Sequence, residues 1–289
     1  MKRAWTAALT LLTAACEAEL SNAPFQQDEA FLAAVPRREV LNLALPAAEP
    51  DGVVEQALGA ETAELYRMTR DLTYGLDHAL FGHLRDVEAI VEQPPSERTD
   101  RRRIWGPYRQ PLLGLEHRFV MTREADGHFA YAFEQRRGYT EFLPVVSGTY
   151  LDGSGEVRFD LDALGGRGRV DVTYAREDGA VDLVFEMNGY AGRPGEAPAD
   201  ATYLARREPD GAGEIEFGFL AADGATWEMH SRWRADGSGR ADARITPPGA
   251  LQASLVAECW DADFDRVWAK GNVESGDPAA CAFPDAMGM

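Results

Sequence analysis

The chain has 289 residues, of which 45% are hydrophobic, and a formal net charge of −19 at neutral pH. That length and apolar content suffice for one large domain, or two modest ones, with a substantial core. The negative charge excludes nucleic acid as an expected partner, because an acidic surface repels a phosphate backbone. It also disfavours attraction to anionic lipid head groups, so charge alone would not hold the chain at a membrane.

The first sixteen residues are organised like an export signal. Lys2 and Arg3 precede an uncharged stretch that ends at Ala15 and leads directly into Cys16. A membrane-spanning helix needs roughly 20 apolar residues, and this stretch is shorter. A short apolar run behind a basic start is typical of a signal peptide that is removed from the mature protein.

This segment resembles bacterial lipoprotein signals, in which the cysteine becomes the lipidated first residue of the mature chain. The resemblance implies a signal peptide over residues 1–15 and lipidation of Cys16. Glu17, where an inner-membrane lipoprotein usually has Asp, implies an outer-membrane destination. The periplasmic and the surface face stay open. The alternative is an ordinary secretory signal that leaves Cys16 unmodified.

The cysteine count agrees with export. The chain has three cysteines, Cys16, Cys259 and Cys281. An odd number in an exported protein needs an explanation, and lipidation of Cys16 supplies one. We therefore expect a Cys259–Cys281 disulfide, which would stabilise the fold by roughly 3 kcal/mol. Two free buried thiols are the alternative, and the spacing does not suit a zinc site.

An apolar stripe predicts a long amphipathic helix over residues 61–92. The stripe recurs every three, four or seven residues, and it consists of Leu65, Leu72, Leu76, Leu80, Leu84, Val87 and Val91. Pro94 and Pro95 end the pattern. Gly75 and Gly82 weaken it and leave open a bend or a break into two helices.

From about residue 104 the apolar period changes to two, which is typical of half-buried antiparallel strands. Stretches such as "HFAYAFEQ" and "AVDLVFEMN" alternate in this way. Asp-Gly pairs, a strong hairpin signal, punctuate this half at 126–127, 152–153, 178–179, 210–211, 223–224 and 236–237. We expect a meander of about ten or eleven strands with one apolar face.

Turn lengths that keep apolar partners together predict specific cross-strand pairs. The predicted pairs are Tyr174 with Leu183, Val172 with Phe185, Val170 with Met187, Phe219 with Trp227, Phe217 with Met229, Tyr131 with Met121, Phe133 with Phe119, Tyr150 with Val157, and Leu204 with Phe217.

The expected fold is α+β and mostly antiparallel β, a curled meander sheet or unclosed barrel whose apolar face packs on the N-terminal helix. This layout resembles lipoprotein carriers and receptors such as LolA and LolB. The tail "ECWDADFDRVWAKG…AACAF" also resembles bacterial envelope lipoproteins, a likeness that carries no known activity. The expected organisation is a tether over 16–30 and a single domain over 31–289, with a helical part (31–95), a sheet part (104–258) and a disulfide-closed tail (259–289).

Aromatic side chains gather on the predicted inner face of the sheet. They are Phe129, Tyr131, Phe133, Phe185, Phe217, Phe219, Trp227 and Trp233. One hypothesis is that all of these except Trp233 line a cavity for a lipid-like or other apolar ligand. The other is that they fill an ordinary core.

One basic island interrupts the acidic chain between residues 94 and 109. Its arginines are Arg98, Arg101, Arg102, Arg103 and Arg109, and they flank Trp105 and Tyr108. Such a segment suits docking of an acidic protein partner, because guanidinium groups make paired contacts with carboxylates and phosphates. The alternative is a solvated connector between the helix and the first strand.

No catalytic, metal-ligating or cofactor-binding pattern stands out. His78 and His83 are five apart and so do not share a helix face. His117 is predicted to face Gln135 with no carboxylate or cysteine cluster beside it, and "DGSGE" at 152–156 lacks the spacing of a calcium loop. We therefore expect a lipid-anchored, non-catalytic envelope protein without cofactor or metal that binds or scaffolds. The alternatives are a partner-docking lipoprotein with a packed core and a hydrolase with an unrecognised site.

Overall fold

The structure is a computed structural model, and it describes residues 23–43, 45, 62–110, 112–163, 166–191, 199–221, 223–271 and 273–286. The predicted signal peptide and Cys16 lie outside the described residues. The helices are α1 (Ala23–Ala33), α2 (Arg38–Leu41), α4 (Glu64–Val91) and the 3-10 turn η1 (Pro278–Ala280). The strands are β1 (Glu97–Arg98), β2 (Arg102–Gln110), β3 (Leu115–Ala125), β4 (His128–Arg137), β5 (Leu143–Leu151), β6 (Ser154–Asp160), β7 (Arg169–Glu177), β8 (Ala180–Tyr190), β9 (Ala199–Arg207), β10 (Gly213–Leu220), β11 (Thr226–Trp233), β12 (Gly239–Thr246), β13 (Ser254–Trp260), β14 (Arg266–Lys270) and β15 (Ser275–Gly276).

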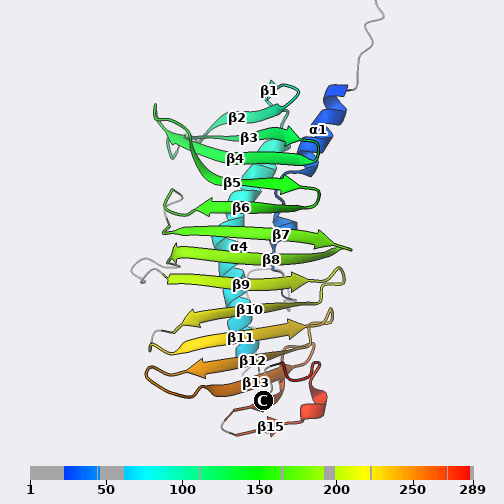
Figure 1. The fold of residues 1–289 in the computed structure, drawn as a ribbon, viewed down its shortest axis with the longest axis vertical. Coiled ribbons are helices and arrows are strands. Elements are labelled where there is room, and N and C mark those ends of the chain that lie inside the picture. The colour runs from blue at the N-terminus through cyan, green and yellow to red at the C-terminus, as the bar shows by residue number, and fades with distance from the viewer. Residues whose placement is uncertain are drawn as a thin grey trace, which may run out of the picture.

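The strands form one antiparallel sheet in which each strand pairs with the next along the chain (Figure 1). The sheet is not closed, and its edge strands β1 and β15 have two residues each, which leaves little unpaired edge. The predicted mostly antiparallel, unclosed α+β fold is thus confirmed. The sheet is larger than expected, however, with 15 strands among the described residues. It begins at Glu97 and continues beyond residue 258 to Gly276, because the predicted tail itself supplies β14 and β15.

Helix α4 runs across the strands on one face of the sheet (Figure 1). It is continuous for 28 residues through Gly75 and Gly82, and most of its predicted apolar stripe is buried. Two polar contacts fix it to the sheet. The Leu65 backbone N–H donates to the Glu258 carboxylate at 2.7 Å, and the hydroxyls of Thr69 and Ser231 lie 2.6 Å apart. The helix therefore starts at a defined place against β11 and β13.

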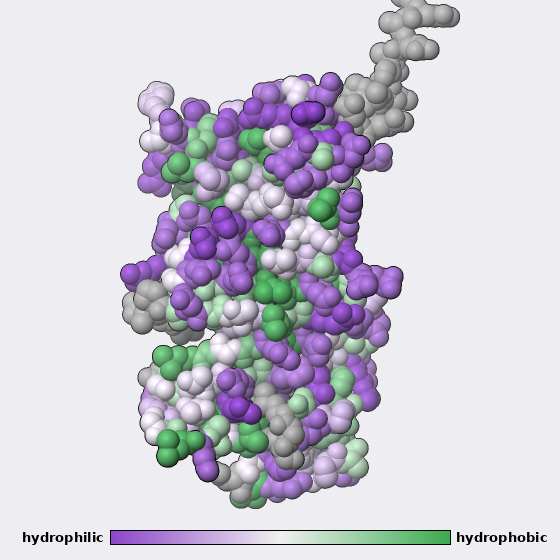
Figure 2. Space-filling view, in the orientation of Figure 1, coloured by the Kyte–Doolittle hydropathy of each residue, from purple (hydrophilic) through white to green (hydrophobic). Residues whose placement is uncertain are grey.

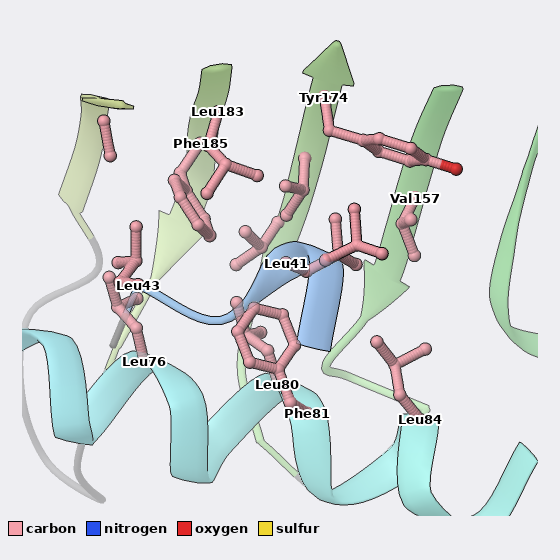
Figure 3. Packing of buried hydrophobic residues seen from close by; sticks show 14 of the residues in the cluster. Leu41, Leu43, Leu76, Leu80, Phe81, Leu84, Val157, Tyr174, Leu183 and Phe185 are labelled. Atoms are coloured by element: carbon pink, nitrogen blue, oxygen red, sulfur yellow. The ribbon is translucent and has the colours of Figure 1, made fainter. Parts of the chain in front are cut away.

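A further layer lies between α4 and the sheet. Figure 3 shows Leu41 and Leu43, from α2 and the residues after it, between the helix and the strands that carry Val157 and Phe185. Leu41 is 0% exposed and Leu43 is 2% exposed. The chain's own N-terminal segment thus fills the space beneath the helix.

Helix α1 includes the second half of the predicted tether. The helix begins at Ala23, so residues 23–30 of the tether predicted over 16–30 are helical. Phe31 explains why this segment is held in place, because its ring is fully buried and lies 5.0 Å from the ring of Phe129. Burying an aromatic side chain contributes enough to hold a short helix against a sheet.

Most of the predicted strand pairs are confirmed. The pairs around residues 178–179, 125–127 and 222–224 occur as predicted. The pair of Tyr150 with Val157 is wrong, because Asp152 and Gly153 take positive φ angles of 45° and 91° and close a two-residue turn. Leu204 pairs with Glu216 instead of Phe217, so its side chain faces solvent, 46% exposed.

The C-terminal tail crosses the face of the sheet opposite α4. The predicted Cys259–Cys281 disulfide is confirmed, and it joins the tail to β13. Arg232 donates to the carbonyl of Pro284 at 2.6 Å, and Arg234 donates to that of Ala282 at 2.5 Å. These contacts hold residues 281–285 over β11 and β12.

Candidate functional site

The inner aromatic residues lie where the sequence predicts them, in the main core. Exposed fractions are 3% for Phe129, 4% for Tyr131, 1% for Phe133, 0% for Phe185 and 5% for Phe217. Phe219 and Trp227 are partly buried and stack on each other, with ring centroids 5.8 Å apart. These residues belong to the main core cluster or pack against it, and Phe129 also contacts Phe31 of α1. Their contacts match an ordinary core, and a ligand-lining role stays a prediction.

Tyr131 shows how tightly this core is closed. Its hydroxyl donates to the carbonyl of Glu156 at 2.8 Å. Burial raises the pKa of the phenol well above its ordinary value, and the nearby Tyr174 and Glu156 add to the shift. The phenol therefore stays neutral at physiological pH and acts as a buried hydrogen-bond donor.

The basic island divides into arginines with different roles. Arg103 is 1% exposed and pairs with Asp28 of α1, and its guanidinium lies 4.5 Å from the ring centroid of Phe31. Arg98 reaches the same carboxylate at 3.0 Å. Burial alone would raise the pKa of Asp28, but hydrogen bonds from the two arginines outweigh burial and lower that pKa. This half of the island therefore fastens α1 to the sheet.

The other arginines of the island face solvent. Arg109 pairs with Glu116 at 2.9 Å, and its side chain is 74% exposed. Arg101 and Arg102 are exposed at the start of β2. Docking of an acidic partner by the whole island stays a prediction, with Arg101 and Arg102 the members best placed for it.

Two clefts lie at the β1 end of the molecule. The larger, about 640 Å³, lies between α1, the end of α4 and the first strands. Its lining includes Asp28, Leu32, Glu92, Arg98 and Trp105. The indole N–H of Trp105 is buried and has no hydrogen-bond partner. A buried donor without an acceptor is costly, so this N–H weakens the packing beside the cleft.

The smaller cleft has about 240 Å³ and brings together Asp86, Tyr108 and His117. A β-bulge between Trp105 and Tyr108 shapes its wall. Gly106 makes the bulge possible, because its φ is +103° and a Cβ there would lie 2.9 Å from the carbonyl oxygen of His117. The bulge thus sets where Tyr108 stands beside the cleft.

Burial lowers the pKa of His117, and the negative charge of Asp86 opposes this shift. His83 on α4 has the same two influences in the same order. Both imidazoles are therefore mostly neutral at physiological pH. Sequence reasoning placed His117 opposite Gln135 correctly but missed Asp86, because a strand register does not say where a helix crosses the sheet.

A third cleft, about 550 Å³, lies beneath the tail at the other end of the sheet. Arg240, Trp268, Lys270, Glu274 and Phe283 contribute to its lining. The Arg240 guanidinium lies 5.3 Å from the ring centroid of Trp268 and is paired with Asp242. Its charge is thus largely neutralised within the protein.

Asp77 on α4 is the carboxyl group with the clearest upward shift. Burial raises its pKa to about 7, while a hydrogen bond from the Leu43 backbone and the charges of Arg207 and Arg38 oppose the shift. Asp77 lines none of the three clefts, so it does not support a hydrolytic site.

Within the described ranges, no group of three or more His, Cys, Asp and Glu side chains is arranged to hold a metal ion. No helix in the described part of the chain is long and apolar enough to cross a membrane. Comparison of the chain with protein-family models, curated proteins and solved structures found no match. The structure itself therefore defines the class, an unclosed antiparallel sheet packed on a central helix with clefts at both ends.

Proposed function

We propose that this chain is a lipid-anchored lipoprotein of the cell envelope that works as a non-catalytic binding or scaffolding module. The Cys259–Cys281 disulfide is the observation that carries the proposal. Structural disulfides persist in oxidising compartments outside the cytoplasm. The bridge accounts for two cysteines and leaves Cys16, directly behind the signal-like segment, as the residue for a lipid.

The packing supports binding at the outside of the fold. The space between α4 and the sheet, where a lipid carrier would hold its cargo, contains Leu41 and Leu43 of the chain itself (Figure 3). The two clefts at the β1 end and the one beneath the tail open to the surface. The proposed module therefore keeps a packed core and meets its partners through these outer features.

Fatty-acid labelling in the cells that produce the protein tests the anchor. We expect an alkyne-tagged fatty acid to label the parent chain, which fractionates with the outer membrane, and to leave Cys16→Ser unlabelled. The matched control is Cys281→Ser, which removes a cysteine but keeps Cys16 and the label. A parent chain that stays unlabelled contradicts the proposal.

Native mass spectrometry tests the packed core. Every contact described above lies between residues 23 and 286, so a chain that begins at Glu17 retains all of them. We expect this chain, purified without detergent, to show the mass of the protein alone. A stoichiometric lipid would contradict the packed-core form of the proposal and return attention to the inner aromatic residues.

A further inference from the structure

Two neighbouring connections near the β1 end expose large apolar side chains to solvent. The exposed fractions are 99% for Leu112 and 61% for Leu113, between β2 and β3, 107% for Tyr139, between β4 and β5, and 61% for Leu143, the first residue of β5. Leu115 pairs with Arg137 and Gln135 pairs with Leu143, so both connections leave the same margin of the sheet. Because neighbouring strands lie about 4.8 Å apart, these four side chains lie at one corner of the sheet. We call them the tips of this corner.

Contacts beside the tips fix the connection between β4 and β5. The ring of Phe142 lies between two guanidinium groups, those of Arg118 at 4.2 Å and Arg136 at 4.3 Å. Arg136 also pairs with Glu116 at 2.5 Å. Phe142 is thus held by arginines of β3 and β4, while Tyr139 of the same connection is exposed to solvent.

Charged side chains of both signs border this corner. Arg109, Arg136 and Arg137 lie beside the four tips, and Glu116 pairs with the first two of them. Arg137 is exposed, so it is the positive charge best placed to meet a lipid phosphate.

We propose that this corner inserts into the interfacial region of a lipid bilayer. Leucine and tyrosine are side chains that enter this zone, and the exposed Arg137 beside them is placed to reach a phosphate group. The inference rests on the proposed lipid anchor at Cys16. Cys16 and Ala23 are seven residues apart, so their Cα atoms can be at most about 25 Å from each other. Ala23 starts α1 at the end of the molecule where β1 lies (Figure 1). Anchor and corner together would hold the β1 end against the membrane.

The far end of the sheet offers a matched control. Figure 2 shows hydrophobic surface at its lower left and, mixed with hydrophilic surface, at its upper left. Leu251, between β12 and β13, is 101% exposed, which is close to the 99% of Leu112 at the corner. The connection around Leu251, residues 247–253, has no arginine or lysine and belongs to the opposite end of the strand order. Insertion at the corner predicts that Leu251 plays no part.

Flotation with vesicles of phosphatidylethanolamine and phosphatidylglycerol tests insertion, with the non-acylated chain that begins at Glu17. We expect the double variant Leu112→Ser/Leu113→Ser to weaken binding at least about tenfold, because two apolar side chains are lost from the lipid contact. Leu251→Ser should bind like the parent. An unchanged urea midpoint in each variant shows that the fold is retained.

The outcomes separate the two proposals. A parent chain that does not float, or a Leu251→Ser chain weakened as much as the double variant, overturns insertion at the corner. Fatty-acid labelling of Cys16 in cells without vesicle binding overturns insertion and leaves the anchor standing. Vesicle binding without fatty-acid labelling overturns the lipid anchor and leaves insertion of the corner standing.

Discussion

Asp77 carries an unfavourable charge in the folded protein. One of its carboxylate oxygens is buried without a hydrogen-bond partner, and burial raises its pKa to about 7. In the unfolded chain the pKa is about 3.9. Since the folded state binds the proton more tightly, this group's contribution to stability is fully present below pH about 4. It is lost as the pH rises through about 7.

Replacing Asp77 by asparagine should therefore stabilise the protein at alkaline pH only. We expect Asp77→Asn to raise the free energy of unfolding by about 1–3 kcal/mol at pH about 8 and to leave it unchanged at pH about 4. Urea unfolding at both pH values measures this. Asp71→Asn on the same helix is the control, because Asp71 is 68% exposed. Equal stability of parent and Asp77→Asn at the higher pH would show that the carboxyl is hydrated.

Asp242 and Asp171 each form ion pairs with two arginines, but the first carboxylate is buried and the second is partly exposed. Asp242 is 0% exposed and pairs with Arg240 at 2.6 Å and Arg232 at 3.1 Å. Asp171, 21% exposed, pairs with arginines that are about half exposed. We expect Asp242→Asn to cost about 3–5 kcal/mol, because it leaves buried arginine charge unpaired. Asp171→Asn should cost about 1 kcal/mol or less. Similar costs in urea unfolding would mean that water reaches Asp242.

At the scale of elements, the glycines of α4 weaken a helix that is otherwise well packed. A Cβ at Gly75 or Gly82 would meet no atom within 4 Å. We expect Gly82→Ala to raise the free energy of unfolding by about 0.5–1 kcal/mol, because alanine favours the helix. Gly148→Ala in β5 should destabilise, since its Cβ would lie 1.9 Å from the carbonyl oxygen of Glu156. Thermal unfolding of both variants checks the opposite signs, and a destabilised Gly82→Ala would reveal an obstruction beside the helix.

The fold was largely predictable because each element has a local signature. The stripe from Leu65 to Val91 has the helical period, and turns such as Asp178–Gly179 fix a register by themselves. The two wrong strand pairs have the same cause, because more than one loop length keeps apolar residues on one face of the sheet. Leu204 looked suited to the inner face, yet the sheet turns its neighbours Tyr203 and Ala205 inward instead.

The candidate sites were much less predictable, because they depend on contacts between distant segments. No sequence pattern near Arg103 predicts that its guanidinium will pair with Asp28. Likewise, the cleft that contains Asp86 and His117 exists only once α4 has crossed β3. The exposed tips at Leu112 and Tyr139 have no periodic pattern, and their shared corner follows from strand order.

At the scale of the whole molecule, α4 links strands that do not contact each other. A sheet in strict sequential order has contacts mainly between neighbours and would be free to unfold from one end. Helix α4, however, packs against β2 and β3 as well as β12 and β13. Its polar contacts with Glu258 and Ser231 lie at the far end. The helix should therefore make the unfolding of the two ends a single event.

Tryptophan fluorescence and circular dichroism can test this coupling on one variant. Trp105→Phe removes the tryptophan of β2, so the fluorescence of the described sheet then comes from Trp227, Trp233, Trp260 and Trp268 near its other end. Circular dichroism reports the helix and all strands. We expect both signals to change at the same urea concentration with the disulfide intact, as two-state unfolding requires. Adding Glu258→Ala, which removes a helix contact at the far end, should lower both midpoints together. If fluorescence alone moved to lower urea, the last strands would unfold independently, and α4 would not couple the two ends.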